Sequence, residues 1–278
     1  MQNNKTKAKL KAGEVAFGSE IMFPSPDVVE ILGYAGLDFV YMDTEHSSST
    51  HESLVHMVRA AEISGTTSLV RIPEQTPGQY PGYILRILDL GVMGVIVPHV
   101  DTREEAQAVV DSVKYHPMGK RGMFGGRPTG YGYLMTTSEY VKKANEETMA
   151  IIMIESGEGV KNVKEILSVP GIDVIQIGSS DLSQSLGYPG KLNEPVVLKA
   201  IDKIINETRK AGVAVGVGSF ASFPPERIKH FMDSGVQFIN IGTSNIITTG
   251  VDQWREKLEG YKKAPATKSR RPRAASFG

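Results

Sequence analysis

Short runs of apolar residues alternate with longer amphipathic runs along almost the whole chain. Eight apolar runs have the length of a β-strand: residues 15–17, 39–42, 68–72, 94–98, 151–154, 174–177, 214–217 and 238–241. Such nearly continuous runs are typical of parallel strands buried on both faces. Between them, apolar residues at helical spacing predict helices at residues 27–32, 51–64, 80–90, 103–115, 159–169, 194–211, 224–234 and 251–261.

Eight strands alternating with eight helices predict an α/β protein with one domain, a (β/α)8 TIM barrel. The alternative is a doubly wound open sheet, but Gly-x-Gly-x-x-Gly is missing after the first strand, and Gly216-Val217-Gly218 is only a late fragment of it. Residues 118–137 interrupt the alternation. They are rich in glycine and aromatic residues, which is typical of a lid or a binding loop.

Charge divides the chain into three parts. Residues 1–13 form a polar segment with four lysines, and residues 262–278 form a basic tail with six Lys and Arg residues. Neither contains an acid, so the neutral chain leaves a net charge of −10 on residues 14–261, the expected barrel domain. An acidic body argues against nucleic-acid binding. We expect both basic tails to be disordered.

The composition excludes several chemistries and locations. The chain contains no cysteine, which excludes disulfides, thiolate metal ligands and cysteine nucleophiles. The N-terminus does not resemble a signal peptide, and no apolar run is long enough to span a bilayer. We therefore expect a soluble cytoplasmic protein that does not bind membranes.

In such a barrel the reacting groups lie where the strands end. Two predicted strands end close to a lone carboxylate, Glu155 after residues 151–154 and Asp181 after residues 174–177. Burying a carboxylate costs several kcal/mol unless a charge or hydrogen bonds compensate it. One divalent cation shared by both acids is the simplest compensator. Alternatively, Glu155 pairs with Arg71 and Asp181 caps the following helix.

Other polar residues follow predicted strands too. Arg71 is suited to bind a substrate oxyanion, or it is a structural partner of Asp43 or Glu45. His46 is a candidate base or only a hydrogen-bonded loop residue, and His99 has the same two interpretations. The run Ser179-Ser180-Asp181 offers N–H groups at a helix start for a carboxylate, or is an ordinary cap. No lysine lies in or directly after a predicted strand, which disfavours Schiff-base chemistry.

These motifs resemble those of the HpcH/HpaI aldolases, the metal-dependent class II pyruvate aldolases such as 4-hydroxy-2-oxoheptanedioate aldolase. The resemblance extends from the first strand to about Leu258. It is carried by Asp43-Thr44-Glu45-His46, Val70-Arg71, Val97-Pro98-His99-Val100-Asp101-Thr102, Lys120-Arg121-Gly122, Ile154-Glu155 and Ile177-Gly178-Ser179-Ser180-Asp181-Leu182-Ser183.

The resemblance implies roles for individual residues. Glu155 and Asp181 would bind Mg²⁺, Mn²⁺ or Co²⁺. Ser179 and Ser180 would offer backbone N–H groups to the pyruvate carboxylate, and Arg71 would contact the 2-oxo oxygen. His46, oriented by Asp43 or Asp89, would transfer protons through a metal-bound water. The substrates would be a 2-oxo acid and an aldehyde, and the protein would form a homo-oligomer, a hexamer built as a trimer of dimers that exchange the last helix.

The chain also departs from the family pattern. Many members have Gly-Pro-Ala-Asp at residues 178–181 and glutamine in place of Met153, and the segments 74–81 and 124–131 differ as well. These differences concern the acceptor more than the metal site. A second hypothesis therefore keeps the enolate but forms a carbon–carbon bond with oxaloacetate, as citrate-synthase-like or macrophomate-synthase-like relatives do. A third hypothesis is a catalytically silent barrel that binds 2-oxo acids.

Overall fold

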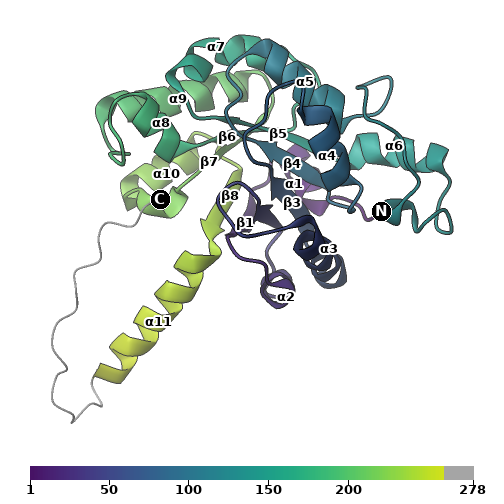
Figure 1. Cartoon of the computed structure of the whole chain (residues 1–278). Helices are drawn as coiled ribbons and strands as arrows, with labels where there is room; N and C mark the ends of the chain where they lie inside the picture. The colour runs from purple at the N-terminus through teal and green to yellow at the C-terminus, as the bar shows by residue number, and fades with distance from the viewer. Residues whose placement is uncertain (260–278) are drawn as a thin grey trace.

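The computed structural model describes residues 1–259, and its eight strands form one closed parallel barrel in which each strand pairs with the next (Figure 1). The strands are β1 (Ala16–Ile21), β2 (Phe39–Asp43), β3 (Thr67–Arg71), β4 (Gly94–Val97), β5 (Met149–Ile154), β6 (Val174–Ile177), β7 (Ala214–Val217) and β8 (Phe238–Gly242). β8 pairs with β1 and closes the ring. The predicted (β/α)8 barrel is thereby confirmed.

Helices connect the strands, and most of them surround the barrel. They are α1 (Lys5–Lys11), α2 (Pro26–Tyr34), α3 (His51–Ser64), α4 (Tyr80–Leu88), α5 (Arg103–Val113), α6 (Thr137–Glu147), α7 (Gly157–Leu167), α8 (Ser179–Ser185), α9 (Pro195–Lys210), α10 (Pro225–Asp233) and α11 (Thr243–Glu259). The predicted helices correspond to α2–α5, α7, α9, α10 and α11. The sequence pattern did not predict α1 or α6, and it indicated α8 only as a helix start at Ser179–Asp181.

A packed layer of side chains fills the barrel interior. The rings of Phe39 and Phe238 stack there with their centroids 4.2 Å apart, and both side chains are fully buried. Gly18 on the neighbouring strand makes room for them, because a Cβ at that position would lie 2.5 Å from the Phe39 ring. Phe39 and Phe238 are the first residues of β2 and β8, so this apolar layer fills the barrel near the strand N-termini and leaves the end formed by the strand C-termini open.

The first residues of the chain close the other end. They were expected to form a disordered polar tail, but Lys5–Lys11 form α1, and its Leu10 packs into the barrel interior. Lys7 is buried, with Nζ 2.9 Å from Asp173 and donating to the carbonyl oxygen of Thr148. Buried ion pairing of this kind explains why a lysine-rich segment is ordered. The basic tail at 262–278 lies outside the described residues.

The long connection at 118–136 does not cover the strand C-termini of its own chain. It follows the C-terminal end of α5, and helices of this fold run back from the open end of the barrel to the opposite end. Arg127 fixes it there, donating to the Leu90 carbonyl oxygen and pairing with Glu62. Of the two expectations, a lid over the cavity of the same chain was therefore wrong, because no residue of this connection lines that cavity, and a binding loop stays a prediction.

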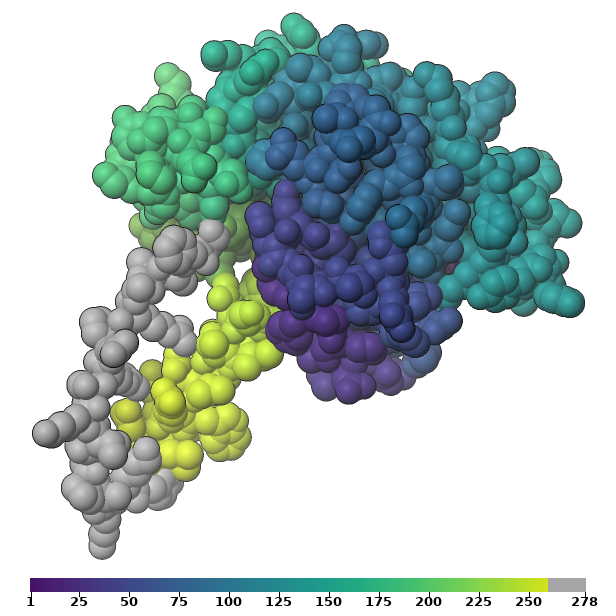
Figure 2. All heavy atoms as spheres, viewed as in Figure 1, coloured from purple at the N-terminus to yellow at the C-terminus, as the bar shows by residue number. Residues whose placement is uncertain are grey.

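α11 leaves the body of the molecule. It begins directly after β8, eight residues earlier than predicted, and projects away from the barrel (Figure 1) as an isolated rod in the space-filling view (Figure 2). Apolar side chains along it are exposed, among them Ile247, Val251 and Trp254, the last with 64% of its surface accessible. No helix within residues 1–259 combines the length and the apolar character needed to cross a membrane.

Candidate active site

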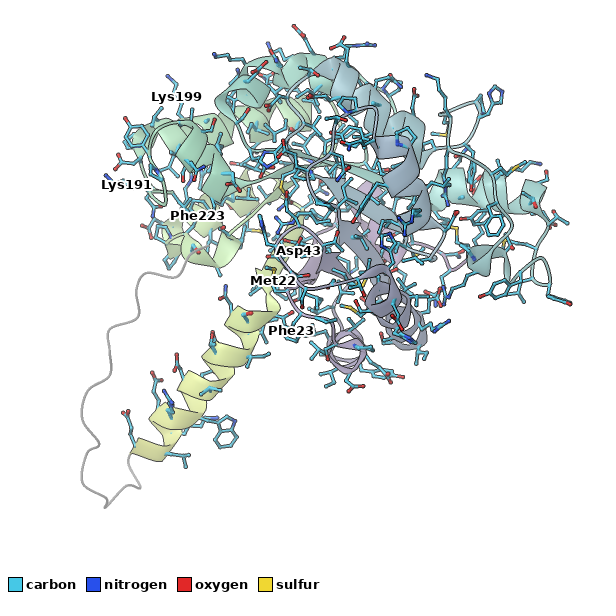
Figure 3. All side chains as sticks on the ribbon, viewed as in Figure 1. Met22, Phe23, Asp43, Lys191, Lys199 and Phe223 are labelled. Carbon is cyan, nitrogen blue, oxygen red and sulfur yellow. The ribbon has the colours of Figure 1, made fainter. Side chains whose placement is uncertain are left out.

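A cavity of about 430 Å³ opens at the C-terminal end of the barrel strands. Asp43 and Met22, labelled in Figure 3, lie beside each other where β1 and β2 reach this end, since Ile21 pairs with Met42. The cavity is lined by predicted site residues and by others that were not predicted: Glu20, Tyr41, His46, Arg71, Met153, Glu155, Gln176, Ser179, Ser180, Asp181, Asn240 and Asn245 among them. The structure thus brings most of the predicted residues together.

Glu155 follows β5 and is almost fully buried, with 3% of its surface accessible. The pKa of Glu155 is raised to about 7, chiefly by burial, with His99 opposing the shift and the negative charge of Asp181 contributing to it. The His99 backbone N–H donates to Glu155 Oε1 at 2.8 Å, and the ring Nδ1 lies 3.3 Å from the same oxygen. Glu155 therefore does not pair with Arg71, the alternative considered from sequence.

Gly178 allows the Glu155 side chain to occupy this position. A Cβ on Gly178 would lie 2.2 Å from Glu155 Oε2, far inside van der Waals contact. Asp181 lies in the first turn of α8, which begins directly after Gly178. Gly178 is the N-cap residue of α8, so the alternative in which Asp181 caps this helix does not hold. Both carboxylates line one cavity and repel each other.

Arg71 ends β3 and is held by three acids. It donates to Asp43 through two nitrogens, with Nε–Oδ1 2.8 Å and Nη2–Oδ2 2.9 Å, and Nη2 also donates to Glu20 Oε1 at 3.1 Å. Nε lies 3.4 Å from Glu45 Oε2. Burial would raise the pKa of Asp43, but the hydrogen bonds and charge of Arg71 outweigh it and lower that pKa. The guanidinium is therefore charged and fixed at the cavity wall.

His46 lies at the rim of the cavity. Its backbone N–H donates to Asp43 Oδ2 at 3.1 Å, and Nε2 lies 3.7 Å from Glu45 Oε2. The side chain is 60% exposed. Asp43 therefore positions the loop that carries His46, whereas the imidazole ring faces Glu45 and solvent.

Ser179 and Ser180 are the first two residues of α8 and line the cavity. The Ser179 hydroxyl donates to the Gly218 carbonyl oxygen at 3.0 Å, and the Ser180 hydroxyl lies 3.2 Å from that of Ser219. These bonds fix the start of α8 against the loop after β7. The first N–H groups of a helix have no carbonyl partner within it and favour a negative charge.

Two predicted site residues do not line the cavity: Asp43, which lies behind Arg71 and bonds to it, and Asp89, which is distant from it. Asp89 is the C-cap residue of α4 and accepts a hydrogen bond from Arg121 Nη2 at 3.0 Å. Because α4 runs back to the strand N-termini, Asp89 lies at the opposite end of the barrel from His46. Within one chain Asp89 cannot orient this histidine.

The sequence pattern did not indicate a role at the site for Glu20 and gave only weak support for a role of His99. Glu20 lies in β1, which was predicted to end at residue 17 because Gly18, Ser19 and Glu20 interrupt the apolar run. His99 has a φ of 52°, a left-handed conformation that side chains other than glycine seldom adopt. The polar end of β1 was a signal that the strand reaches a polar cavity.

A second cavity of about 510 Å³ lies at the other end of the barrel, between α3, the 118–136 connection and the N-terminus. Of the charged residues that line it, Arg127 and Glu62 already pair with each other, and Arg59 and the amino group of Met1 add only positive charge. The paired carboxylates and the strand C-termini single out the smaller cavity as the candidate active site.

Comparison with known proteins agrees with this geometry. Residues 22–248 match the family described as HpcH/HpaI aldolase/citrate lyase, and this span contains every residue of the cavity discussed above except Glu20. The chain belongs to this family. The span includes seven of the eight strands, β2 to β8.

Named relatives of this HpcH/HpaI chain are aldolases. The hydroxypyruvate/pyruvate aldolase of Sagittula stellata is 34% identical over 243 residues, which cover 87% of this chain and 92% of the relative. The 2-keto-3-deoxy-L-rhamnonate aldolase of Escherichia coli is 30% identical over 269 residues, 96% of this chain and 97% of the relative. The chain is therefore a carbon–carbon lyase.

A solved structure extends the comparison to bond formation. The crystal structure of the citrate synthase SbnG is 30% identical and superimposes with a TM-score of 0.78, covering 92% of this chain and 98% of that one. The HpcH/HpaI barrel thus also occurs in an enzyme named for synthesis.

Proposed function

We propose that this HpcH/HpaI lyase cleaves the C3–C4 bond of a 4-hydroxy-2-oxo acid to give pyruvate and an aldehyde, and forms the same bond in reverse. The observation that supports it best is the grouping of Glu155, Asp181 and Arg71 in one cavity at the strand C-termini. The carboxylate pair can hold a cation, and that cation together with the fixed guanidinium would supply the positive charge that a 2-oxo acid and its enolate require.

The residues present fit a divalent ion, Mg²⁺, Mn²⁺ or Co²⁺, held by Glu155 and Asp181. A buried carboxyl whose pKa is raised to about 7 and which faces a second acid needs a positive charge to remain ionised. Residues 1–259 contain no group of three or more His, Asp or Glu side chains arranged around a metal. Two protein ligands suit Mg²⁺, which keeps waters and substrate oxygens in its other positions. The ion supplies positive charge for the carboxylate and 2-oxo oxygens of the substrate.

The other residues bind and orient the 2-oxo acid. The N–H groups of Ser179 and Ser180, at the positive end of α8, receive its carboxylate. Arg71 donates to the 2-oxo oxygen, and its two hydrogen bonds to Asp43 keep the guanidinium in place while negative charge develops.

Cleavage removes one proton from the substrate and adds one proton to the pyruvate enolate. His46 accepts the proton of the C4 hydroxyl, the C3–C4 bond breaks, and the aldehyde leaves. The electron pair of that bond remains on pyruvate as the enolate, which takes up a proton at C3. The exposed ring of His46 can exchange this proton with solvent.

The experiment is chelation and reconstitution. Protein treated with EDTA and desalted is assayed for pyruvate release from 4-hydroxy-2-oxo acids, then again with Mn²⁺, Mg²⁺ or Co²⁺. We expect chelation to abolish turnover and a divalent ion to restore it. Full turnover in excess chelator contradicts the proposal, and pyruvate binding without any turnover favours the silent barrel.

A second candidate function is synthesis with oxaloacetate, which the similarity to SbnG favours. Oxaloacetate loses CO₂ to give the same enolate, which then attacks an acyl or carbonyl acceptor. Comparing oxaloacetate decarboxylation alone with decarboxylation in the presence of an acceptor separates the two functions, because only a synthase couples CO₂ release to a new carbon–carbon bond.

We also propose that the protein is a homo-oligomer, a hexamer of three dimers, in which the exposed apolar side of α11 packs on a neighbouring copy. The exposed Trp254 and Val251 support this, because monomers seldom expose a continuous apolar surface of this kind. A cytoplasmic location remains a prediction from the sequence. The oligomeric state is measured by analytical ultracentrifugation.

A further inference from the structure

Glu20 is a fixed carboxylate at the cavity wall. It lies in β1 between Tyr41 of β2 and Gly242 of β8, the residues with which it pairs in register. Oε1 accepts a hydrogen bond from Arg71 at 3.1 Å, and the side chain also hydrogen-bonds Tyr41. Its side chain remains 21% exposed and lines the cavity. It is therefore held in one orientation and still accessible to a ligand.

The cavity contains more acid than base. Among the described lining residues Arg71 is the only Lys or Arg, whereas Glu20, Glu155 and Asp181 are acidic. The charge of Arg71 is already balanced by its two hydrogen bonds to Asp43. A divalent ion on Glu155 and Asp181 would balance those two acids, so the charge of Glu20 is left over.

The wall next to Glu20 is polar but neutral. The β8 end and the start of α11 contribute Asn240, Ser244 and Asn245 to the cavity. Amides and hydroxyls donate to and accept from alcohol groups, and a carboxylate accepts from them. No lysine, arginine or histidine from β8 or α11 lines this wall within the described residues. If the acceptor carried a carboxylate, Glu20 would repel it, and no positively charged side chain of this wall would compensate.

We propose that Glu20 determines acceptor specificity: it accepts a hydrogen bond from a hydroxyl of a neutral hydroxyaldehyde and disfavours aldehydes that carry a carboxylate. The inference rests on the proposed aldolase function and names its second substrate class. In the addition, pyruvate loses a C3 proton, the enolate carbon attacks the aldehyde carbon, and the aldehyde oxygen takes up a proton. Glu20 takes no part in these transfers and is a positioning residue.

The test compares two aldehydes of equal carbon number, glycolaldehyde and glyoxylate, with saturating pyruvate and Mn²⁺. The value of kcat/KM for each is measured in wild type and in Glu20→Gln, which keeps the shape and removes the charge. We expect the glyoxylate-to-glycolaldehyde ratio to rise at least tenfold in the variant. Glu226→Gln, an exposed position on α10, is the matched control and should leave the ratio unchanged.

Exchange of the pyruvate methyl protons with D₂O reports enolate formation without an acceptor. If wild type shows neither exchange nor product with any aldehyde, the proposed function fails. If exchange is normal but the ratio in Glu20→Gln stays within threefold of wild type, only the specificity proposal is overturned. Glu20→Ser provides a second neutral variant. If both variants lose exchange or fail to fold, Glu20 is a support for Arg71 and the proposal is also overturned.

Discussion

The most direct test of the metal site is Gly178→Ala. A Cβ at this position would lie 2.2 Å from Glu155 Oε2 and 2.7 Å from Glu155 Cβ, whereas ordinary contact begins at 3.4 Å. The carboxylate oxygen must therefore move by about 1.2 Å. Gly178 has a φ of −80°, which alanine adopts readily, so the effect is steric and not a backbone effect.

A shift of this size exceeds the tolerance of a catalytic site. Functional groups must be held within ~0.5 Å, and a displacement of ~1 Å can cost ~100-fold in rate. We expect Gly178→Ala to weaken Mn²⁺ binding at least ~10-fold and to lower kcat/KM about 100-fold. Calorimetry measures the first and pyruvate release the second. Thermal unfolding checks that the fold survives.

Two further variants make the reasoning refutable. Gly242→Ala also adds a methyl group at the cavity, but its Cβ would lie 3.9 Å from the nearest atom, Asn245 Nδ2, so Mn²⁺ affinity should not change. In a Glu155→Gly background all three atoms that clash, Oε2, Cβ and Cδ of Glu155, are gone, so Gly178→Ala should have no additional effect on stability. Unchanged Mn²⁺ affinity and turnover in Gly178→Ala alone would refute the placement of Glu155 at the metal.

Three other predictions follow from the site and from α11. Arg71→Ala should lower turnover at least ~100-fold, and Arg71→Lys should not restore it, because an ammonium cannot reproduce the two-nitrogen contact with Asp43; near-normal kcat in either variant would contradict the role of Arg71. Burial raises the pKa of Glu155 to about 7 without metal, so protons compete with Mn²⁺ below pH 7, and affinity measured by calorimetry should fall about tenfold per pH unit there. A flat affinity between pH 5 and 7 would show that Glu155 is not a ligand. Trp254→Glu places a charge on the exposed side of α11 and should shift the sedimentation coefficient towards smaller species without lowering the unfolding temperature of the barrel; an unchanged oligomer would exclude α11 from the contact.

The barrel could be predicted from sequence because its strands are buried on both faces. Residues 151–154 and 174–177, for example, are apolar without interruption, and the structure places β5 and β6 there. The pattern failed where a strand end faces the cavity, as in β1, because Ser19 and Glu20 are polar there. It also failed for α6, where only Tyr140 and Ala144 are buried and the apolar stripe is short.

The candidate site could likewise be predicted only in part. Glu155, Asp181 and Arg71 could be located because each follows an apolar strand and parallel strands end together. The roles of their neighbours depend on geometry that no pattern records. The positive φ of His99 aims its N–H at Glu155, and the direction of α4 separates Asp89 from His46. Sequence places residues on elements, whereas three-dimensional packing decides which of them meet.

The stacked rings of Phe39 and Phe238 have a consequence for the order of events. They block the barrel at its N-terminal end, so substrates and products must enter and leave through the one opening at the strand C-termini. A donor bound deep beside Glu155 is then covered by the acceptor. We expect an ordered sequence: in synthesis pyruvate binds before the aldehyde, and in cleavage pyruvate leaves after it.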